Sequence, residues 1–330
     1  AAAAAPTGTG EGSGEVGKSD IVIAGKSDIK TLDPMGTNDT TSSIAHRHIY
    51  SRLIEIDENS EIVGDLAESW EHLIPKECWE DAREEARERV NLDGTDCTAS
   101  DVKFSLERAK EMPRVKQYVE QIDSITVEDD HNLTLHLAEP YAPLLAALSH
   151  TGTSIVPEAA VTAQGDAFWE NPIGTGPMQF VEWVPNDHYS LKRFDDYFKG
   201  PGKTTSLTLR IMPEGGARTI ALETGEIDMS ISVDATDVQN VKANKELMAL
   251  EKTSVSVEYL AMNCEKEPFN DPKVRQAINY AINKEALAKV AFSGYAFPSE
   301  GPLPQGVTVC LNLPQRLLPG CFGVPRRLPA

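Results

Sequence analysis

The sequence contains no apolar run of about 18 residues, the length a membrane-spanning helix needs, so it predicts no transmembrane segment. It also lacks an excess of basic residues: 31 Lys and Arg stand against 51 Asp and Glu, a formal net charge of −20. A nucleic-acid binder needs a basic surface to contact phosphates, so this balance argues against that class. It fits a protein that stays soluble and monomeric outside a membrane.

Cysteine spacing and catalytic motifs are equally uninformative about chemistry. The five cysteines are an odd number and form no Cys-x-x-Cys pair, so the sequence indicates neither a zinc site nor a full disulfide framework. His46 and His48 are two residues apart and point in different directions on a helix, which disfavours a metal pair. Gly174-Thr-Gly176 lacks the Lys-Ser/Thr of a phosphate loop and predicts a tight turn instead. We therefore expect no enzyme, no bound metal and no cofactor.

The two ends of the chain differ in composition from the rest. Residues 1–18 are small and Gly-rich, and we interpret them as a flexible linker, either an artificial or disordered terminus or the tether of a bacterial lipoprotein. No secretory signal is recognisable there. Residues 308–330 hold prolines and arginines without an acidic residue, and we expect them to be unstructured or non-native.

Between these ends, strands and helices alternate irregularly, as in a mixed α/β protein. Of the 330 residues, 40% are apolar and 25% charged, as in ordinary globular proteins. Strands are expected at 20–24, 122–128, 132–138, 178–184, 189–194, 207–211, 227–231 and 255–262, and helices at 43–53, 140–148 and 217–224. Thr98-Ala-Ser-Asp101 resembles a capping box that opens another helix.

Two further segments carry specific expectations. Residues 71–92 include the dense charge run CWEDAREEARER, whose i,i+4 pairs are poor, so we expect an irregular segment there. Asp271 and Pro272 are a good N-cap and first helical residue for an amphipathic helix that continues through Leu287 and Val290 toward Gly294.

Seven blocks of the chain resemble, in the same order, the family 5 extracellular solute-binding proteins, which are the oligopeptide, dipeptide and nickel receptors of ABC importers. The blocks lie at 31–34 (TLDP), 50–55 (YSRLIE), 64–70 (GDLAESW), 93–108 (DGT and TASDVKFSLER), 172–177 (PIGTGP), 221–228 (ALETGEID) and 263–294. One departure is that the charge run replaces the Thr-, Phe- and Arg-containing strand typical of the family.

The resemblance implies an α/β, periplasmic-binding-protein-like fold of two lobes (type II, family 5), with the first lobe largely present and the second truncated. We expect the first lobe at 19–258 and the start of the second at 259–307. The implied function is capture of an oligopeptide or dipeptide in the interlobe cleft and delivery to ABC transporter permease subunits in the membrane, without catalysis. The implied location is the periplasm, or the outer face of the cell membrane as a lipoprotein. The alternatives are a peptide-sensing receptor without transport and a nickel-chelate binder.

The resemblance also implies ligand-binding residues. A loop of the first lobe that faces the cleft corresponds to residues 35–41, and the passage into the second lobe corresponds to residues 259–263. The expected ligand contacts are Met35, Thr37, Asn38, Thr40, Thr41, Tyr259, Met262 and Asn263. Because a missing strand and a missing lobe would leave a sheet edge and one wall of the cleft open, we expect this chain to bind ligand poorly.

Overall fold

The computed structural model describes residues 18–57, 61–73, 81–86, 89–90, 96–138, 141–251 and 256–299. Residues 1–17 of the linker expected over 1–18, and the whole tail expected over 308–330, lie outside these ranges. The chain divides into two compact units, Ala1–Val233 and Asp234–Ala330, so the expected lobe boundary at residue 258 falls inside the second unit. Within the described ranges, no helix is both long and apolar enough to cross a bilayer.

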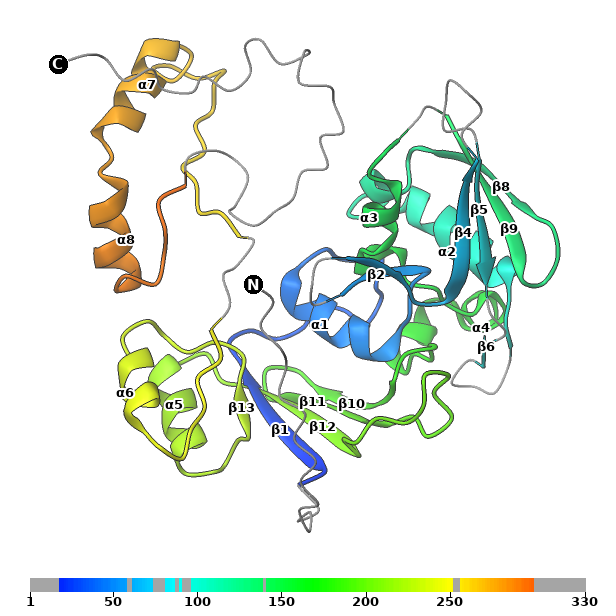
Figure 1. Ribbon diagram of the computed structural model, residues 1–330, viewed down its shortest axis with the longest axis horizontal. Helices are drawn as coiled ribbons and strands as arrows, with labels where there is room; N and C mark the ends of the chain where they lie inside the picture. The colour runs from blue at the N-terminus through cyan, green and yellow to red at the C-terminus, as the bar shows by residue number, and fades with distance from the viewer. Residues whose placement is uncertain are drawn as a thin grey trace, which may run out of the picture. The chain divides into compact units, whose positions relative to one another are not determined.

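A five-stranded mixed sheet organises the first part of unit 1. Its order is β10-β11-β12-β1-β13, with β1 parallel to β12 and β13 and the other pairs antiparallel. The strands are β1 (Asp20–Gly25), β10 (Met178–Val184), β11 (His188–Arg193), β12 (Ser206–Ile211) and β13 (Met229–Ser230). Five of the expected strands are thereby present, although the one expected at 227–231 shortens to two residues. Helix α1 (Thr40–Ile49) lies against this sheet and contacts β10 (Figure 1).

A four-stranded antiparallel sheet forms the second part of unit 1. Its order is β4-β5-β9-β8, built from β4 (Ala67–Leu73), β5 (Asp81–Ala86), β8 (Ile122–Val127) and β9 (Asn132–Leu137). Strand β5 lies inside the charge run that was expected to be irregular, and that expectation is wrong for its backbone. The strand pairs with β4 on one side and β9 on the other, so hydrogen bonds to two neighbours hold a segment whose own pattern predicts no element.

Helix α2 (Ala99–Glu111) packs on the second sheet along β8. The predicted capping box is confirmed: the backbone N–H of Thr98 donates to the Asp101 carboxylate at 2.9 Å. Val102, Leu106 and Ala109, the predicted apolar face, are fully buried. They belong to the main core of unit 1, which also takes in α1 and both sheets. A second, smaller cluster consists of Ala24, Ala221 and Ile227.

Shorter elements complete unit 1. They are β2 (Ile54–Ile56), β3 (Ile62–Gly64), β6 (Arg89–Val90), β7 (Asp96–Cys97), α3 (Leu144–Leu148), α4 (Glu158–Gln164), α5 (Gly215–Glu223) and the 3₁₀ turns η1 (Lys116–Tyr118), η2 (Thr151–Thr153) and η3 (Gly165–Glu170). Helix α3 begins four residues after the expected start of a helix at 140.

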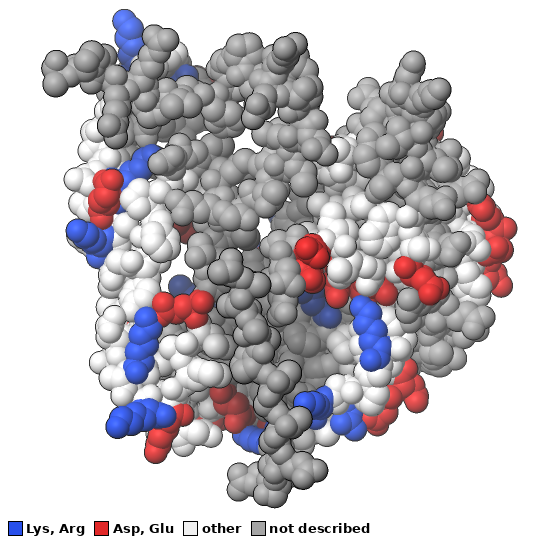
Figure 2. Space-filling view, in the orientation of Figure 1, with Lys and Arg blue, Asp and Glu red and all other residues white. Residues whose placement is uncertain are grey.

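On the face shown in Figure 2, acidic and basic side chains of the described residues are interspersed among uncharged ones and do not gather into one patch.

The loop around Gly174 and Gly176 packs directly on the end of helix α1. The Gly176 N–H donates to the Ile49 carbonyl at 2.9 Å. A Cβ added at Gly174 would lie 2.5 Å from the Ile49 carbonyl oxygen, and one at Gly176 would lie 2.5 Å from that of His48. Both positions therefore require glycine because of backbone approach, in agreement with the tight turn predicted for this motif.

The buried side chain of Arg218, on α5, ties together three backbone segments at the end of unit 1. Its Nη1 donates to the carbonyls of Met212 at 2.7 Å and Pro213 at 2.8 Å, and its Nε donates to the carbonyl of Ser232 at 3.2 Å. Only 1% of the residue is exposed, so these bonds form away from water and compensate for burying the guanidinium.

The second unit contains α6 (Val238–Ala243), α7 (Pro272–Ala281) and α8 (Lys284–Phe292). Asp271 caps α7 and Pro272 is its first residue, as predicted. The single helix expected up to Gly294 is instead two helices, because Asn283 accepts a hydrogen bond from the Ala286 N–H and starts α8. Residues 256–262 form no strand, contrary to expectation.

Candidate functional site

The loop that joins β1 to α1 holds the ligand-binding residues predicted in unit 1. It leaves the carboxyl end of β1, the strand that lies between two parallel neighbours in the sheet. Ligands of α/β proteins commonly bind outside the carboxyl ends of parallel strands, because loops and helix starts meet there. We refer to residues 31–41 as the ligand loop.

An ion pair fixes the first part of the ligand loop to helix α2. Arg108 makes a bidentate contact with Asp33, at 2.9 Å from Nη1 and 2.6 Å from Nη2. The same carboxylate accepts the Met35 N–H at 3.0 Å, and the guanidinium lies 4.6 Å from the centre of the Trp169 ring. Because Asp33 is buried, its negative charge would destabilise the fold without this partner. The bidentate pairing offsets that cost and also fixes the direction of the loop.

Helix α1 holds the ligand loop from another side. The Tyr50 hydroxyl donates to the Leu32 carbonyl at 2.9 Å, and His46 Nε2 lies 2.9 Å from the Thr31 carbonyl, which makes Nε2 the protonated nitrogen. Burial lowers the pKa of His46, so the ring is neutral near pH 7. Its Nδ1 has no hydrogen-bond partner among the described residues. Two buried side chains thus fix successive carbonyls of the loop.

Asp39 caps helix α1, whose first two residues, Thr40 and Thr41, are the last of the ligand loop. Its carboxylate accepts the Ser42 N–H at 3.0 Å and the hydroxyls of Thr37 at 2.7 Å and Ser42 at 2.9 Å. Burial alone would raise the pKa of Asp39, but these hydrogen bonds and the nearby Lys30 outweigh it, so the pKa lies below its usual value. The helix was expected to begin at 43; the structure places its cap at Asp39 and its start at Thr40.

Five predicted ligand contacts lie together in the ligand loop, but they are not equally accessible. Met35 is fully buried, 3.0 Å from Arg108 through its sulfur, and Thr37 is buried against Asp39. Asn38 and Thr40 are exposed, and Thr41 is half-buried. Asn38 and Thr40 are therefore the most solvent-accessible of the five.

The other three predicted contacts lie in an irregular segment of the second unit. Tyr259 is 81% exposed, Met262 is half-buried, and Asn263 is exposed. The side chain of Asn263 accepts the Glu265 N–H at 2.9 Å and its carbonyl accepts the Lys266 N–H at 3.1 Å, as in a turn residue.

Sequence reasoning did not single out Asp33, Arg108 and Trp169, which position the ligand loop. The signal was available in part, because Asp33 and Arg108 lie in two of the blocks that carry the family resemblance. Their pairing spans 75 residues of sequence, which no local pattern encodes. Among the residues that the structure describes, no group of three or more His, Cys, Asp or Glu side chains could hold a metal ion.

Comparison with known proteins gives a consistent assignment. The sequence profile of "Bacterial extracellular solute-binding proteins, family 5 Middle" matches residues 92–311. The glutathione-binding protein GsiB of Pectobacterium atrosepticum is 33% identical over 299 residues, which cover 87% of this chain and 56% of that protein. The chain thus spans little more than half the length of this curated relative.

Solved structures of similar proteins support the same family assignment. That of DppA from Helicobacter pylori in complex with the peptide STSA is 27% identical with a TM-score of 0.78, covering 86% of this chain and 60% of that one. NikZ from Campylobacter jejuni in complex with Ni(L-His) is 27% identical with a TM-score of 0.75, covering 86% and 57%. The predicted α/β solute-binding fold is confirmed, and the chain belongs to family 5 of the bacterial extracellular solute-binding proteins.

Proposed function

We propose that this chain is part of the solute-binding component of an ABC importer, which captures a short peptide and delivers it to permease subunits in the membrane. The protein acts outside the cytoplasm, in the periplasm or as a lipoprotein on the outer face of the membrane, as a monomer and without catalysis. The observation that carries the proposal is the similarity to a glutathione-binding relative over 87% of this chain. The neighbour solved with the peptide STSA supports the same ligand class.

The ligand loop supports the proposal physically. Four side chains, those of Asp33, His46, Tyr50 and Arg108, fix its backbone before any ligand arrives. A loop held in its binding conformation loses little entropy when the ligand binds, which favours affinity. The exposed Asn38 and Thr40 offer an amide and a hydroxyl, which can bond to the main chain of a peptide irrespective of its side chains.

Binding of a nickel chelate is the second candidate, because NikZ was solved with Ni(L-His). Peptide sensing without transport is a variant of the first, because it uses the same site. We also retain the expectation that this chain of 330 residues binds weakly on its own, since it spans 56% of the length of the glutathione-binding relative.

The test is an NMR titration of the backbone amides, which detects weak binding and locates it. Glutathione, Ser-Thr-Ser-Ala and nickel with L-histidine are each added up to about 10 mM, a range that covers the millimolar dissociation constants expected of a weak binder. We expect saturable shifts at residues 36–41 with one peptide, weakened several-fold by Asn38→Ala.

Gln164→Ala, an exposed polar change on α4, is the matched control and should leave the affinity unchanged. Saturation with the nickel complex alone would favour the second candidate. Absence of a saturable shift in the ligand loop with all three ligands would overturn both.

A further inference from the structure

A hollow of about 300 Å³ opens on the core face of the five-stranded sheet, toward the beginning of β1, whereas the ligand loop follows the end of that strand. Ile21 and Ile23 of β1 and Leu207 of β12 line it, and Ile21 lies opposite Leu207 in the parallel register. Pro177 and Met178 form another wall, because the loop at Gly176 is held against the end of α1. The body of the hollow is therefore aliphatic.

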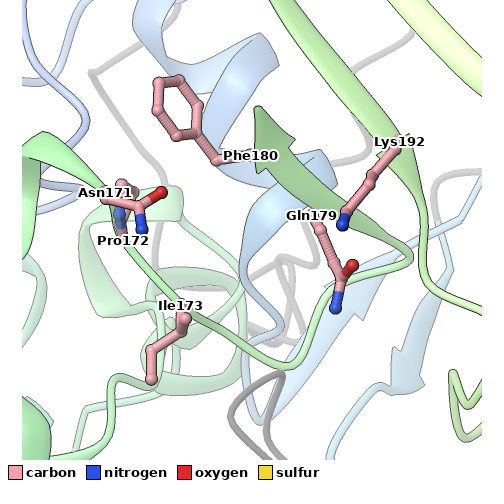
Figure 3. A pocket seen from close by; sticks show the side chains of 6 residues that line it. All are labelled: Asn171, Pro172, Ile173, Gln179, Phe180 and Lys192. Carbon is pink, nitrogen blue, oxygen red and sulfur yellow. The ribbon is translucent and has the colours of Figure 1, made fainter. Parts of the chain in front are cut away.

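A smaller hollow of about 160 Å³ lies nearby and differs in character. Figure 3 shows Gln179 and Lys192 lying beside each other on neighbouring strands, with the Phe180 ring directed away from them. Gln179 and Lys192 are opposite each other in the β10–β11 register, one residue from the Met178–Arg193 pair of the larger hollow. Since successive residues of a strand point to opposite faces, the two pairs lie on opposite faces of the hairpin.

Four polar side chains, those of His48, Arg193, Lys203 and Thr204, complete the lining of the larger hollow. His48 Nδ1 lies 2.7 Å from the Ile44 carbonyl, so it carries the proton and Nε2 keeps a lone pair. Burial lowers the pKa of His48, which keeps the ring neutral near pH 7. Arg193 uses Nε for Asp195 and Nη1 for the Gly202 carbonyl. Its Nη2 and the exposed Lys203 ammonium have no partner among the described residues.

The charge around the hollow selects one kind of head group. Lys203 and Arg193 place two cations beside it in a chain whose net charge is −20. The Asp195 carboxylate pairs with Arg193, and the Asp20 carboxylate keeps its charge while it accepts hydrogen bonds from the hydroxyls of Thr205 and Ser206. Lys203 is the cation of the hollow that pairs with no carboxylate among the described residues. An added carboxylate meets attraction at this point and repulsion over much of the remaining surface.

We propose that this hollow is a second binding site, for a small carboxylate with a branched aliphatic or aromatic body and a hydroxyl donor. The body lies on Ile21, Ile23 and Leu207, the carboxylate faces Lys203 and Arg193, and the hydroxyl donates to His48 Nε2. The volume is at the lower end of the roughly 300–1,000 Å³ of small-molecule sites, which restricts the ligand to a compact molecule. The site is independent of the ligand loop and of the transport function proposed above.

Methyl NMR of the full chain tests this site with 4-hydroxyphenylacetate as the probe. We expect saturable shifts at the methyl groups of Ile21, Ile23, Leu207 and Met178, with a dissociation constant of about 1 mM. Tyramine has the same ring and hydroxyl but a cationic head, and we expect it to cause no saturable shift. Tyramine binding as tightly as the carboxylate, or shifts confined to other parts of the chain, would overturn the proposal.

Two charge variants distinguish binding in this hollow from nonspecific electrostatic attraction of the carboxylate to the protein surface. Lys203→Gln should weaken binding of 4-hydroxyphenylacetate roughly fivefold, as expected for one exposed ion pair. Lys192→Gln is the matched control, because it removes an equally exposed cation on the other face of the hairpin. Equal effects of the two changes would contradict the assignment. Ile21→Phe should fill the hollow and abolish the methyl shifts, with tryptophan fluorescence confirming that the variant is folded.

Discussion

Helix α2 of unit 1 and helix α8 of the second unit begin in similar ways and end in different environments. Thr98 and Asp101 cap α2, and Asn283 caps α8, each through side-chain contacts to the backbone. Five residues of α2 are buried, whereas α7 and α8 contain no buried residue among those described. The caps and periodicity of a sequence therefore define where a helix starts, but packing decides whether it is stable.

The same contrast applies to large apolar side chains. Leu106 of α2 is fully buried in the core of unit 1, while Leu287 and Val290 of α8 are 55% and 84% exposed. Val290 belongs to the apolar pattern that the sequence predicted for this segment. The helix has formed, but among the described residues no other element buries this side chain. Apolar surface left in water contributes nothing to folding until another surface covers it.

Substitution of matched leucines should break this comparison most clearly. Leu106→Ala should lower the free energy of unfolding of unit 1 by about 3–4 kcal/mol, because it removes a side chain from a packed core. All four tryptophans lie in unit 1, so tryptophan fluorescence during urea unfolding measures this unit. Leu287→Ala should change the hydrogen exchange of α8 amides by no more than about 0.5 kcal/mol. A loss of several kcal/mol at Leu287 would show that α8 is packed.

Removing the ion pair of the ligand loop should have the next largest effect. Arg108→Met leaves Asp33 buried without its partner and should cost unit 1 about 3 kcal/mol. Lys103→Met on the same helix is the control: its pairing with Glu107 is exposed and 3.9 Å long, so a change below about 0.5 kcal/mol is expected. Urea unfolding checks both. Equal effects would mean that the Arg108 contact does not stabilise the loop.

The smallest effect concerns the two aspartate caps, and it depends on pH. Asp39→Ala should cost unit 1 about 1 kcal/mol at pH 7. Because the folded pKa of Asp39 is depressed, its contribution is complete above the usual aspartate pKa of 3.8 and is lost as the pH falls through the folded pKa. The stability curves of wild type and variant should therefore converge in acid. Asp271→Ala, at the start of α7, should leave the tryptophan-monitored curve unchanged at every pH.

Local chemistry was sufficient to predict several elements. The Thr98–Asp101 box, the alternation in 132–137 and the Pro272 start of α7 each depend on residues within one turn or one strand, and the structure confirms them. Strand β5 could not be predicted, because its backbone is held by β4 and β9, and β9 lies some 50 residues further along the chain. The break at Asn283 was missed because the apolar spacing continues across it.

The ligand loop shows the same limit. Its position was predicted from the family resemblance, but which of its side chains are buried was not, because a loop has no period from which an inner face can be read. Met35 and Thr37 point inward because Asp33, Arg108 and Asp39 hold the backbone in one conformation. Such contacts between distant residues appear only when the chain is folded.

The contacts of Arg218 determine how far the fixed backbone of unit 1 extends. This side chain holds the Ser232 carbonyl, and the first compact unit ends one residue later at Val233. Through its bonds to Met212, Pro213 and Ser232, one side chain joins the two backbone segments that flank α5. The buried guanidinium therefore fixes the backbone of unit 1 up to its last residues.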